Sequence, residues 1–313
     1  MVGGAVAQLY PGQSPVNHTC LLQPSLLSCP PQNPSIVDSC CTETFGGLLL
    51  STQFWSTYTN RESSGQLLPQ NSWTLHGLWP DFCNGSFTQY CDLSRQYDPI
   101  PSPNTTDGTR NGTKVPPYTG PDIGTFVKGF GRYDLLDYMN TYWIAQNQEN
   151  SGFWGHEFSK HATCFSTFNT ACYGPKYVQH SEVVDFFETA VQWYKKVPTY
   201  KWLRKEGIVP SNTTTYSYKE IAGVLGRRHG AVPYVGCTGQ RWNNTEEGRG
   251  GVDSGFTVLS EVWYYDYAYG RPQDGKTVPV NATGSQTNCA KVEGAIRYYE
   301  RTKGSERTPR VPY

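Results

Sequence analysis

The sequence predicts an α+β fold in which helices pack on a central, largely antiparallel sheet that disulfides staple together. Segments with strand periodicity and segments with helix periodicity do not alternate as βαβ units, which disfavours a parallel sheet. The chain contains ten cysteines, an even number, without a C-x-x-C pair or the Cys/His spacing of a zinc site. We therefore expect a single disulfide-stapled domain over residues 20–299.

Several segments have the residue pattern of strands. Residues 48–55 contain three leucines and then an aromatic pair, which indicates a buried strand. Residues 73–80 alternate in polarity and predict a short strand that Pro80 ends, with His76 on the face opposite Leu75. Two further strands are expected at 232–237 and at the tyrosine-rich stretch 256–269.

Apolar residues at helical spacing predict the helices. One helix is expected over 126–143, a second, amphipathic helix over 183–194, and a shorter one over 217–228. Residues 156–161 are also expected to be helical.

The two ends and one internal stretch have the composition of surface chain. We expect residues 1–19 to be a poorly ordered lead-in, although they lack the basic and apolar regions of a signal peptide, and residues 300–313 to be a basic, disordered tail. Residues 99–121 are rich in Pro, Thr and Asn and predict a surface insertion. The chain carries seven glycosylation sequons, at Asn17, Asn84, Asn104, Asn111, Asn212, Asn243 and Asn281.

The sequons and the cysteines together favour an oxidising, secretory compartment over the cytosol. We expect an extracellular protein, or alternatively one of the vacuolar lumen, without membrane association, because no apolar run reaches spanning length. Charged residues are only 17% of the chain and the formal net charge is zero, which argues against a broad basic surface for duplex nucleic acid. A nucleic-acid substrate therefore requires a local cationic site.

Residues 156–161 read H-E-F-S-K-H and can supply such a site. In a helix, His156, Glu157, Lys160 and His161 fall at about 0°, 100°, 40° and 140°, so they share one face. With His76 from the strand at 73–80, they give imidazoles, a carboxylate and an ammonium. This is the equipment for general acid–base chemistry on a phosphate.

Both segments resemble the catalytic segments of a known family. Residues 73–80, W-T-L-H-G-L-W-P, and 153–164, F-W-G-H-E-F-S-K-H-A-T-C, are similar to those of the ribonuclease T2 family, and the cysteine layout resembles its fungal branch. Phe158 stands where the family commonly has Trp, and Ala162 where it has Gly. Neither difference touches a group that transfers protons.

The resemblance implies residue roles and a disulfide pairing. His161 would be the general base, His76 the general acid and His156 the phosphate ligand, with Lys160 and Glu157 stabilising the transition state; no metal or cofactor is implied. A first base site would comprise Trp79, Asp81 and Phe87, and a second Gln53, Ala145, Gln146, Asn147 and Phe153. The implied disulfides are Cys20–Cys41, Cys29–Cys83, Cys40–Cys172, Cys91–Cys164 and Cys237–Cys289.

The resemblance thus implies a monomeric endoribonuclease that cleaves single-stranded RNA, with broad base preference, through a 2′,3′-cyclic phosphate to 3′-phosphate ends. DNA has no 2′-hydroxyl and would not be cleaved. A zinc hydrolase is the rival enzyme class, but Lys160 replaces the second His of H-E-x-x-H and the imidazoles diverge by about 140°. A binding or toxic glycoprotein without catalysis is the non-enzymatic rival. It is disfavoured because His76 and His161 are both present.

Overall fold

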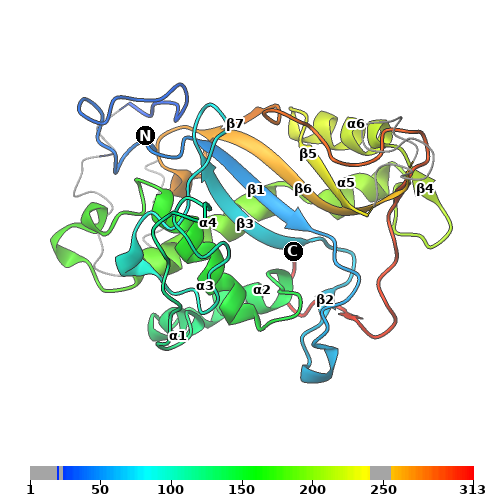
Figure 1. The fold of residues 1–313 in the computed structure, drawn as a ribbon, viewed down its shortest axis with the longest axis horizontal. Coiled ribbons are helices and arrows are strands. Elements are labelled where there is room, and N and C mark those ends of the chain that lie inside the picture. Colours follow the sequence, from blue (N-terminus) through cyan, green and yellow to red (C-terminus); the bar gives the residue numbers. More distant parts are fainter. Residues whose placement is uncertain (1–19, 21–23, 240–254) are drawn as a thin grey trace, which may run out of the picture.

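The computed structural model describes residues 20, 24–239 and 255–313. Its centre is a seven-stranded sheet in the order β3-β1-β6-β8-β4, with β5 and β7 also paired to β6 (Figure 1). The main strands pair antiparallel, and the parallel pairs are β6 with β8 and, in a separate two-stranded sheet, β2 with β9. The strands are β1 (Leu48–Phe54), β2 (Leu68–Pro69), β3 (Thr74–Asp81), β4 (Thr215–Tyr216), β5 (Tyr234–Thr238), β6 (Thr257–Ala268), β7 (Thr277–Val280), β8 (Ile296–Arg297) and β9 (Glu306–Arg307).

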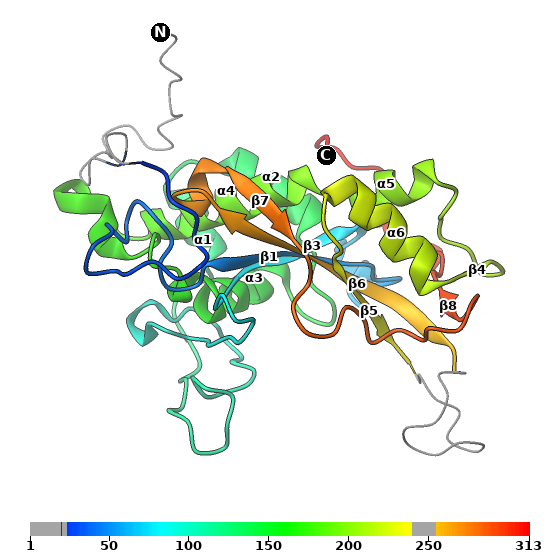
Figure 2. The same ribbon diagram turned by 90° about the horizontal axis from the view of Figure 1, so that it is seen from above.

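Helices α2, α4, α5 and α6 lie over one face of this sheet, as Figure 2 shows. Strand alternation divides the core accordingly: Leu49 packs with the helices α1 to α4, whereas Leu48 and Leu50 pack on the other face with Tyr265. The helices are α1 (Gly124–Gly129), α2 (Tyr133–Tyr142), α3 (Asn150–Lys160), α4 (Ser181–Lys196), α5 (Thr199–Lys205) and α6 (Tyr218–His229). The predicted α+β class with a largely antiparallel sheet is confirmed.

Two differences from the element boundaries expected from the sequence have a local physical cause. The helix predicted over 126–143 is broken into α1 and α2, because Gly131 adopts a left-handed conformation (φ +69°) between them. Strand β3 runs through Pro80 to Asp81 instead of ending at the proline. It can do so because β3 is an edge strand, where a missing N–H does not interrupt the sheet.

The C-terminal segment is ordered, which corrects the expected disordered tail at 300–313. The side chain of Arg301 is only 1% exposed and lies 4.2 Å over the Trp55 ring. Its guanidinium donates to three backbone carbonyls, those of Ser56, Pro69 and Ser72. Further along, β9 pairs with β2, and the Tyr313 hydroxyl donates to the Tyr194 carbonyl at 2.8 Å. Basic and proline-rich composition indicated solvation, but these tertiary hydrogen bonds compensate the burial of the charge.

Five disulfides hold the loops to this frame, and they are the five pairs that the family resemblance implies: Cys20–Cys41, Cys29–Cys83, Cys40–Cys172, Cys91–Cys164 and Cys237–Cys289. The Cys91–Cys164 bond ties the loop after β3 to the turn that follows α3.

Residues 99–121 lie mostly at the surface and project away from the sheet in Figure 2. The sequon asparagines within the described residues are all exposed, namely Asn84, Asn104, Asn111, Asn212 and Asn281. Asn17 and Asn243, like the expected lead-in at 1–19, lie outside the described residues. In the described part of the chain, none of the helices is both long and apolar enough to cross a membrane.

Candidate active site

One buried carboxylate joins two histidines from different elements. His76 comes from the edge strand β3, Glu157 from α3, and His161 caps the C-terminus of α3. Glu157 Oε1 lies 3.4 Å from His76 Nε2, and Glu157 Oε2 lies 4.0 Å from His161 Nε2. The Glu157 side chain is fully buried, whereas the two imidazoles are 17% and 12% exposed. The two imidazoles therefore reach the surface from either side of a carboxylate that solvent cannot reach.

The local sequence explains why the strand can approach the helix so closely. Gly77 has no side chain, and a Cβ at this position would lie 1.9 Å from Glu157 Oε2. Phe54, from the neighbouring strand β1, stacks on the His76 ring at a centroid distance of 3.7 Å. The Trp143 indole donates to the His76 carbonyl at 2.7 Å. Glycine, stacking and a backbone hydrogen bond together fix the position of His76.

Burial and neighbouring charges shift the pKa values of Glu157 and His161. Burial alone would raise the pKa of Glu157, but the charges of His76 and His161 outweigh it and lower this pKa to about 2. Burial lowers the pKa of His161 well below its usual value, with Lys160 adding to this effect and Glu157 opposing it. Glu157 is thus ionised in mildly acidic solution, and His161 is neutral over more of the acidic range than an ordinary histidine.

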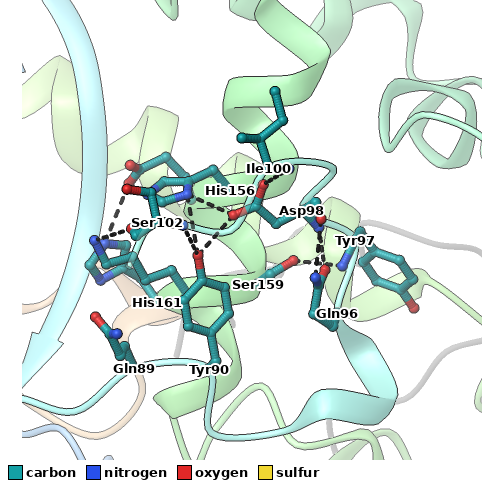
Figure 3. Close-up of polar contacts among 12 residues, drawn as sticks. Gln89, Tyr90, Gln96, Tyr97, Asp98, Ile100, Ser102, His156, Ser159 and His161 are labelled. Carbon is teal, nitrogen blue, oxygen red and sulfur yellow. Dashed lines mark hydrogen bonds and ion pairs between the residues drawn. The ribbon is translucent and has the colours of Figure 1, made fainter. Parts of the chain in front are cut away.

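His156 and Lys160 lie beside this trio on α3. Burial lowers the pKa of Lys160, and the nearby charges of Glu157 and Asp98 oppose that shift. The Lys160 ammonium donates to the Ser102 carbonyl at 3.3 Å. His156 Nδ1 lies 2.7 Å from Asp98 Oδ2 (Figure 3). The structure thus brings all five predicted catalytic and phosphate-binding residues to one end of α3 and the adjoining strand.

Trp79, predicted to bind a base, also contacts the catalytic carboxylate. Its indole N–H donates to Glu157 Oε2 at 2.8 Å, and its ring stacks on His161 with centroids 4.9 Å apart. The Trp263 ring, in β6, makes an edge-to-face contact with the Trp79 ring, with centroids 5.2 Å apart. Trp79 therefore orients Glu157 and His161, in addition to its predicted contact with a base.

The two other residues of the predicted first base site differ in their environment. Asp81 is the last residue of β3, and burial raises the pKa of its carboxyl to about 7. A carboxyl of this kind can donate a hydrogen bond in mildly acidic solution. Phe87 lies in the loop beyond β3 and is 69% exposed, so its ring is accessible for stacking.

Gln53 does not lie where the second base site requires it, which corrects that prediction. Neighbouring residues of a strand point to opposite faces, so Phe54 stacks on His76 while Gln53 faces the helices. The Gln53 side chain is fully buried and donates to the Val197 carbonyl at 2.7 Å. Phe153 does lie near the site, with its ring centroid 5.7 Å from that of His76.

The other residues proposed for the second base site belong to the turn before α3. Ala145 is buried in the core. The side chain of Gln146 donates to the Tyr58 carbonyl at 3.2 Å, and that of Asn147 accepts from Asn60. These contacts hold the turn against the loop after β1, and they commit both polar side chains to protein partners.

Sequence reasoning missed three residues at the site, namely Phe54, Tyr90 and Asp98. Phe54 could have been found from strand alternation, since it lies next to Gln53 on the opposite face. Tyr90 and Asp98 lie in the loop between β3 and α1, where periodicity carries no information about the direction of a side chain. Within the described residues, no group of three His, Cys, Asp or Glu side chains is arranged to hold a metal ion.

Comparisons with known proteins point to one family. The sequence model of the ribonuclease T2 family matches residues 46–270. A ribonuclease T2-like protein of Emericella nidulans is 38% identical over 252 residues, which cover 80% of this chain and 49% of the relative. Ribonuclease Trv of Hypocrea rufa is 36% identical over 263 residues, which cover 84% of this chain and 92% of the relative. The chain spans about half the length of the Emericella relative and of a similar protein from Aspergillus fumigatus.

A solved structure supports the same assignment. The crystal structure of actibind, a T2 ribonuclease, matches the fold with a TM-score of 0.66 at 32% sequence identity, covering 88% of this chain and 96% of that one. The family match over residues 46–270 includes both segments that carry the histidines. The chain therefore belongs to the ribonuclease T2 family.

Proposed function

We propose that the protein is an endoribonuclease that cleaves single-stranded RNA by transphosphorylation, without a metal ion. The observation that carries this proposal is the pair His76 and His161 on the two oxygens of one buried carboxylate, Glu157. Two imidazoles held at a fixed separation can remove one proton and deliver another in the same step. The nucleophile is the 2′-hydroxyl of the substrate, so no metal-bound water is required.

In the first step the 2′-oxygen forms a bond to the adjacent phosphorus, and the bond from phosphorus to the 5′-oxygen breaks. Neutral His161 accepts the proton of the 2′-hydroxyl, and protonated His76 gives a proton to the departing 5′-oxygen. The products are a 2′,3′-cyclic phosphate and a free 5′-hydroxyl. In the second step the roles reverse, water opens the cyclic phosphate, and a 3′-phosphate remains.

The electrostatics of the site favour this division of roles. Because burial lowers the pKa of His161, this ring is the one that stays neutral in mild acid and can act as the base. Glu157 remains ionised and stabilises the proton on His76, 3.4 Å away. In the pentacoordinate transition state the phosphate oxygens carry additional negative charge. Lys160 and His156 lie where they can stabilise that charge.

Aromatic surfaces next to the histidines suit the recognition of unpaired bases. Trp79 and the exposed ring of Phe87 offer stacking contacts, which tolerate different bases. Asp81, with its raised pKa, can add a polar contact to a base edge. We therefore propose broad base preference among RNA substrates and no cleavage of DNA, because DNA lacks the attacking 2′-hydroxyl.

We also propose that the protein works in an oxidising compartment. Five disulfides and exposed sequon asparagines, such as Asn104 and Asn111, favour secretion with attached glycans, or residence in the vacuolar lumen. We propose that the catalytic unit works as a monomer, since both catalytic histidines and Glu157 come from one chain.

Digestion of a defined single-stranded RNA tests this function directly. The products should carry 2′,3′-cyclic phosphate ends early and 3′-phosphate ends late, together with 5′-hydroxyl ends. The matched DNA, and an RNA whose 2′-hydroxyls are methylated, should both remain intact. Products that carry 5′-phosphate ends would show a different chemistry and would contradict the proposal.

Metal independence is a separate prediction. RNA cleavage should continue at an unchanged rate in excess EDTA, because the attacking oxygen belongs to the substrate and Lys160 disfavours a cation beside His156 and His161. The measurement is the initial rate before and after chelation, with added zinc as a control. Complete loss of activity that zinc restores would show that the rival metal-dependent reading is correct.

The pH profile of kcat/KM should be bell-shaped, with an optimum at about pH 4 to 6. On the acid side, activity is lost only when His161 gains a proton, and its lowered pKa moves that loss below about pH 6.5. On the alkaline side, activity falls because the reaction also needs one protonated imidazole as the acid. Glu157→Gln should move the optimum to lower pH, because the Glu157 charge raises the pKa of His161. An optimum at pH 8 or above that does not move in Glu157→Gln would show that groups other than these histidines control the rate.

A further inference from the structure

His156 is held by a buried carboxylate from outside its helix. Its Nδ1 lies 2.7 Å from Oδ2 of Asp98, a side chain that is only 2% exposed, in the loop between β3 and α1. Figure 3 shows the Asp98 carboxylate, the Tyr90 hydroxyl and the His156 ring in one group. The proposed reaction gives no role to Asp98 or Tyr90, and neither belongs to the segments that resemble the family motifs.

The Asp98 carboxylate has a fixed orientation. Its Oδ1 accepts from the Ile100 amide at 2.8 Å, and its Oδ2 accepts from the Tyr90 hydroxyl at 2.8 Å as well as facing His156. The Gln96 side chain brackets the same residue, since it donates to the Asp98 carbonyl at 3.0 Å and accepts from the Asp98 amide. A carboxylate with this many partners cannot rotate away from the imidazole without losing several hydrogen bonds.

The same loop also positions the second cation of the site. The Lys160 ammonium donates to the Ser102 carbonyl at 3.3 Å, and the Ser102 amide donates to the Tyr90 hydroxyl at 3.2 Å. The Tyr90 amide in turn donates to the Lys160 carbonyl at 3.0 Å, and Tyr90 holds a left-handed backbone conformation (φ +49°). A left-handed conformation at a non-glycine residue persists where the surroundings hold it, here next to the Cys91–Cys164 disulfide.

We propose that Asp98, oriented by Tyr90, is a positioning residue that fixes His156 for binding the scissile phosphate. A carboxylate on Nδ1 holds a proton there and turns Nε2 outward, toward the position of the phosphate. In the imidazolium form both ring nitrogens carry protons, so Nδ1 can bond Asp98 while Nε2 bonds the phosphate. This inference rests on the proposed function, because the benefit arises only where His156 meets a phosphate.

The charged groups around His156 make the contribution of Asp98 specific. From the loop, Asp98 and the Tyr90 hydroxyl face the ring. From α3 and its C-cap, Glu157 attracts the imidazolium, whereas Lys160 and His161 repel it when they are charged. Asp98 is therefore the carboxylate that contacts His156 directly while Glu157 serves the other two imidazoles.

Asp98→Asn keeps the shape of the side chain and removes its charge, and it is the first test. We expect KM for a short RNA to rise about tenfold near pH 6, with kcat within about threefold of wild type, because phosphate binding is lost rather than proton transfer. Asp92→Asn is the matched control, because Asp92 caps a 3₁₀ turn in the same loop and pairs with Arg95, not with a histidine.

A double-mutant cycle separates positioning from a general effect on the loop. In a His156→Ala background, Asp98→Asn should change KM by less than about twofold, since the group through which it acts is absent. An equal rise in KM in both backgrounds, or no rise in the Asp98→Asn single variant, would overturn the proposal.

If Asp98→Asn does not fold, the tautomer of His156 in the wild-type protein provides a second test. This test does not depend on enzymatic activity. In nitrogen-15 NMR spectra, neutral His156 should carry its proton on Nδ1, the minor tautomer of a free imidazole, and added inorganic phosphate should shift its Nε2 signal. A neutral His156 protonated on Nε2 would overturn the inference. If wild-type protein cleaves no RNA, the proposed function fails, whereas the tautomer and the phosphate titration still decide what Asp98 does.

Discussion

We expect His76→Ala and His161→Ala each to remove nearly all turnover on RNA, and the double variant to be little worse than either single one. A positioned acid or base contributes about 10² to 10⁴ in rate. The two rings share the carboxylate of Glu157, at 3.4 Å and 4.0 Å, so they work as one unit and the losses should not multiply. The measurement is kcat on a defined RNA under saturating conditions.

Other histidines provide the controls for this prediction. His180 stacks on Phe126 with a centroid distance of 3.7 Å, away from Glu157, and His180→Ala should leave kcat unchanged in protein that remains folded. His156→Ala should retain more turnover than either catalytic variant and lose mainly affinity, as a phosphate ligand would. Near-wild-type kcat in His76→Ala would show that the two-imidazole scheme is wrong.

Much of the fold was predictable, because local periodicity reports the burial of each face. The helix predicted over 183–194 became α4, in which Val183, Phe186, Phe187 and Ala190 are fully buried. The breaks were harder to predict: the apolar spacing over 126–143 continues through Gly131, and only the backbone conformation shows that the helix divides there. The order of the C-terminal segment could not be predicted, since it depends on carbonyl partners for Arg301 that lie more than 200 residues earlier.

The site was predictable where its residues lie on regular elements. Helical spacing predicted that Glu157 and Lys160 share a face, and His161 follows as the C-cap of α3. His76 lies at a register shift between β1 and β3, which strand alternation does not predict, and both histidines still meet Glu157. Gln53 differs from the prediction because it occupies the face of β1 that packs on the helices, where its side chain is buried and bonds the Val197 carbonyl. Asp98 and Tyr90 could not be found, because the loop reaches α3 through turns, side-chain hydrogen bonds and a disulfide that no local pattern encodes.

Gly77→Ala is expected to have the second largest effect, although it changes no catalytic group. The added Cβ would lie 1.9 Å from Glu157 Oε2 and 2.6 Å from Trp79 Nε1. Strand β3 cannot move away easily, because the Thr52 hydroxyl holds Gly77 on both sides. It accepts from the Gly77 amide at 3.0 Å and donates to the Gly77 carbonyl at 3.1 Å. Glu157 must therefore shift and release its histidines. A displacement of about 1 Å at a catalytic group can cost about 10²-fold in rate, and we expect at least that loss in kcat/KM.

Gly129→Ala is the matched control for this substitution. Gly129 lies at the end of α1, has no atoms near the position of an added Cβ, and should tolerate alanine with unchanged kcat/KM. Thermal unfolding distinguishes a local from a global effect: Gly77→Ala should still unfold cooperatively, with a loss of about 1–3 kcal/mol from overpacking. If folded Gly77→Ala keeps wild-type kcat/KM, then Glu157 can move without consequence. In that case the carboxylate would not be what organises the two histidines for catalysis.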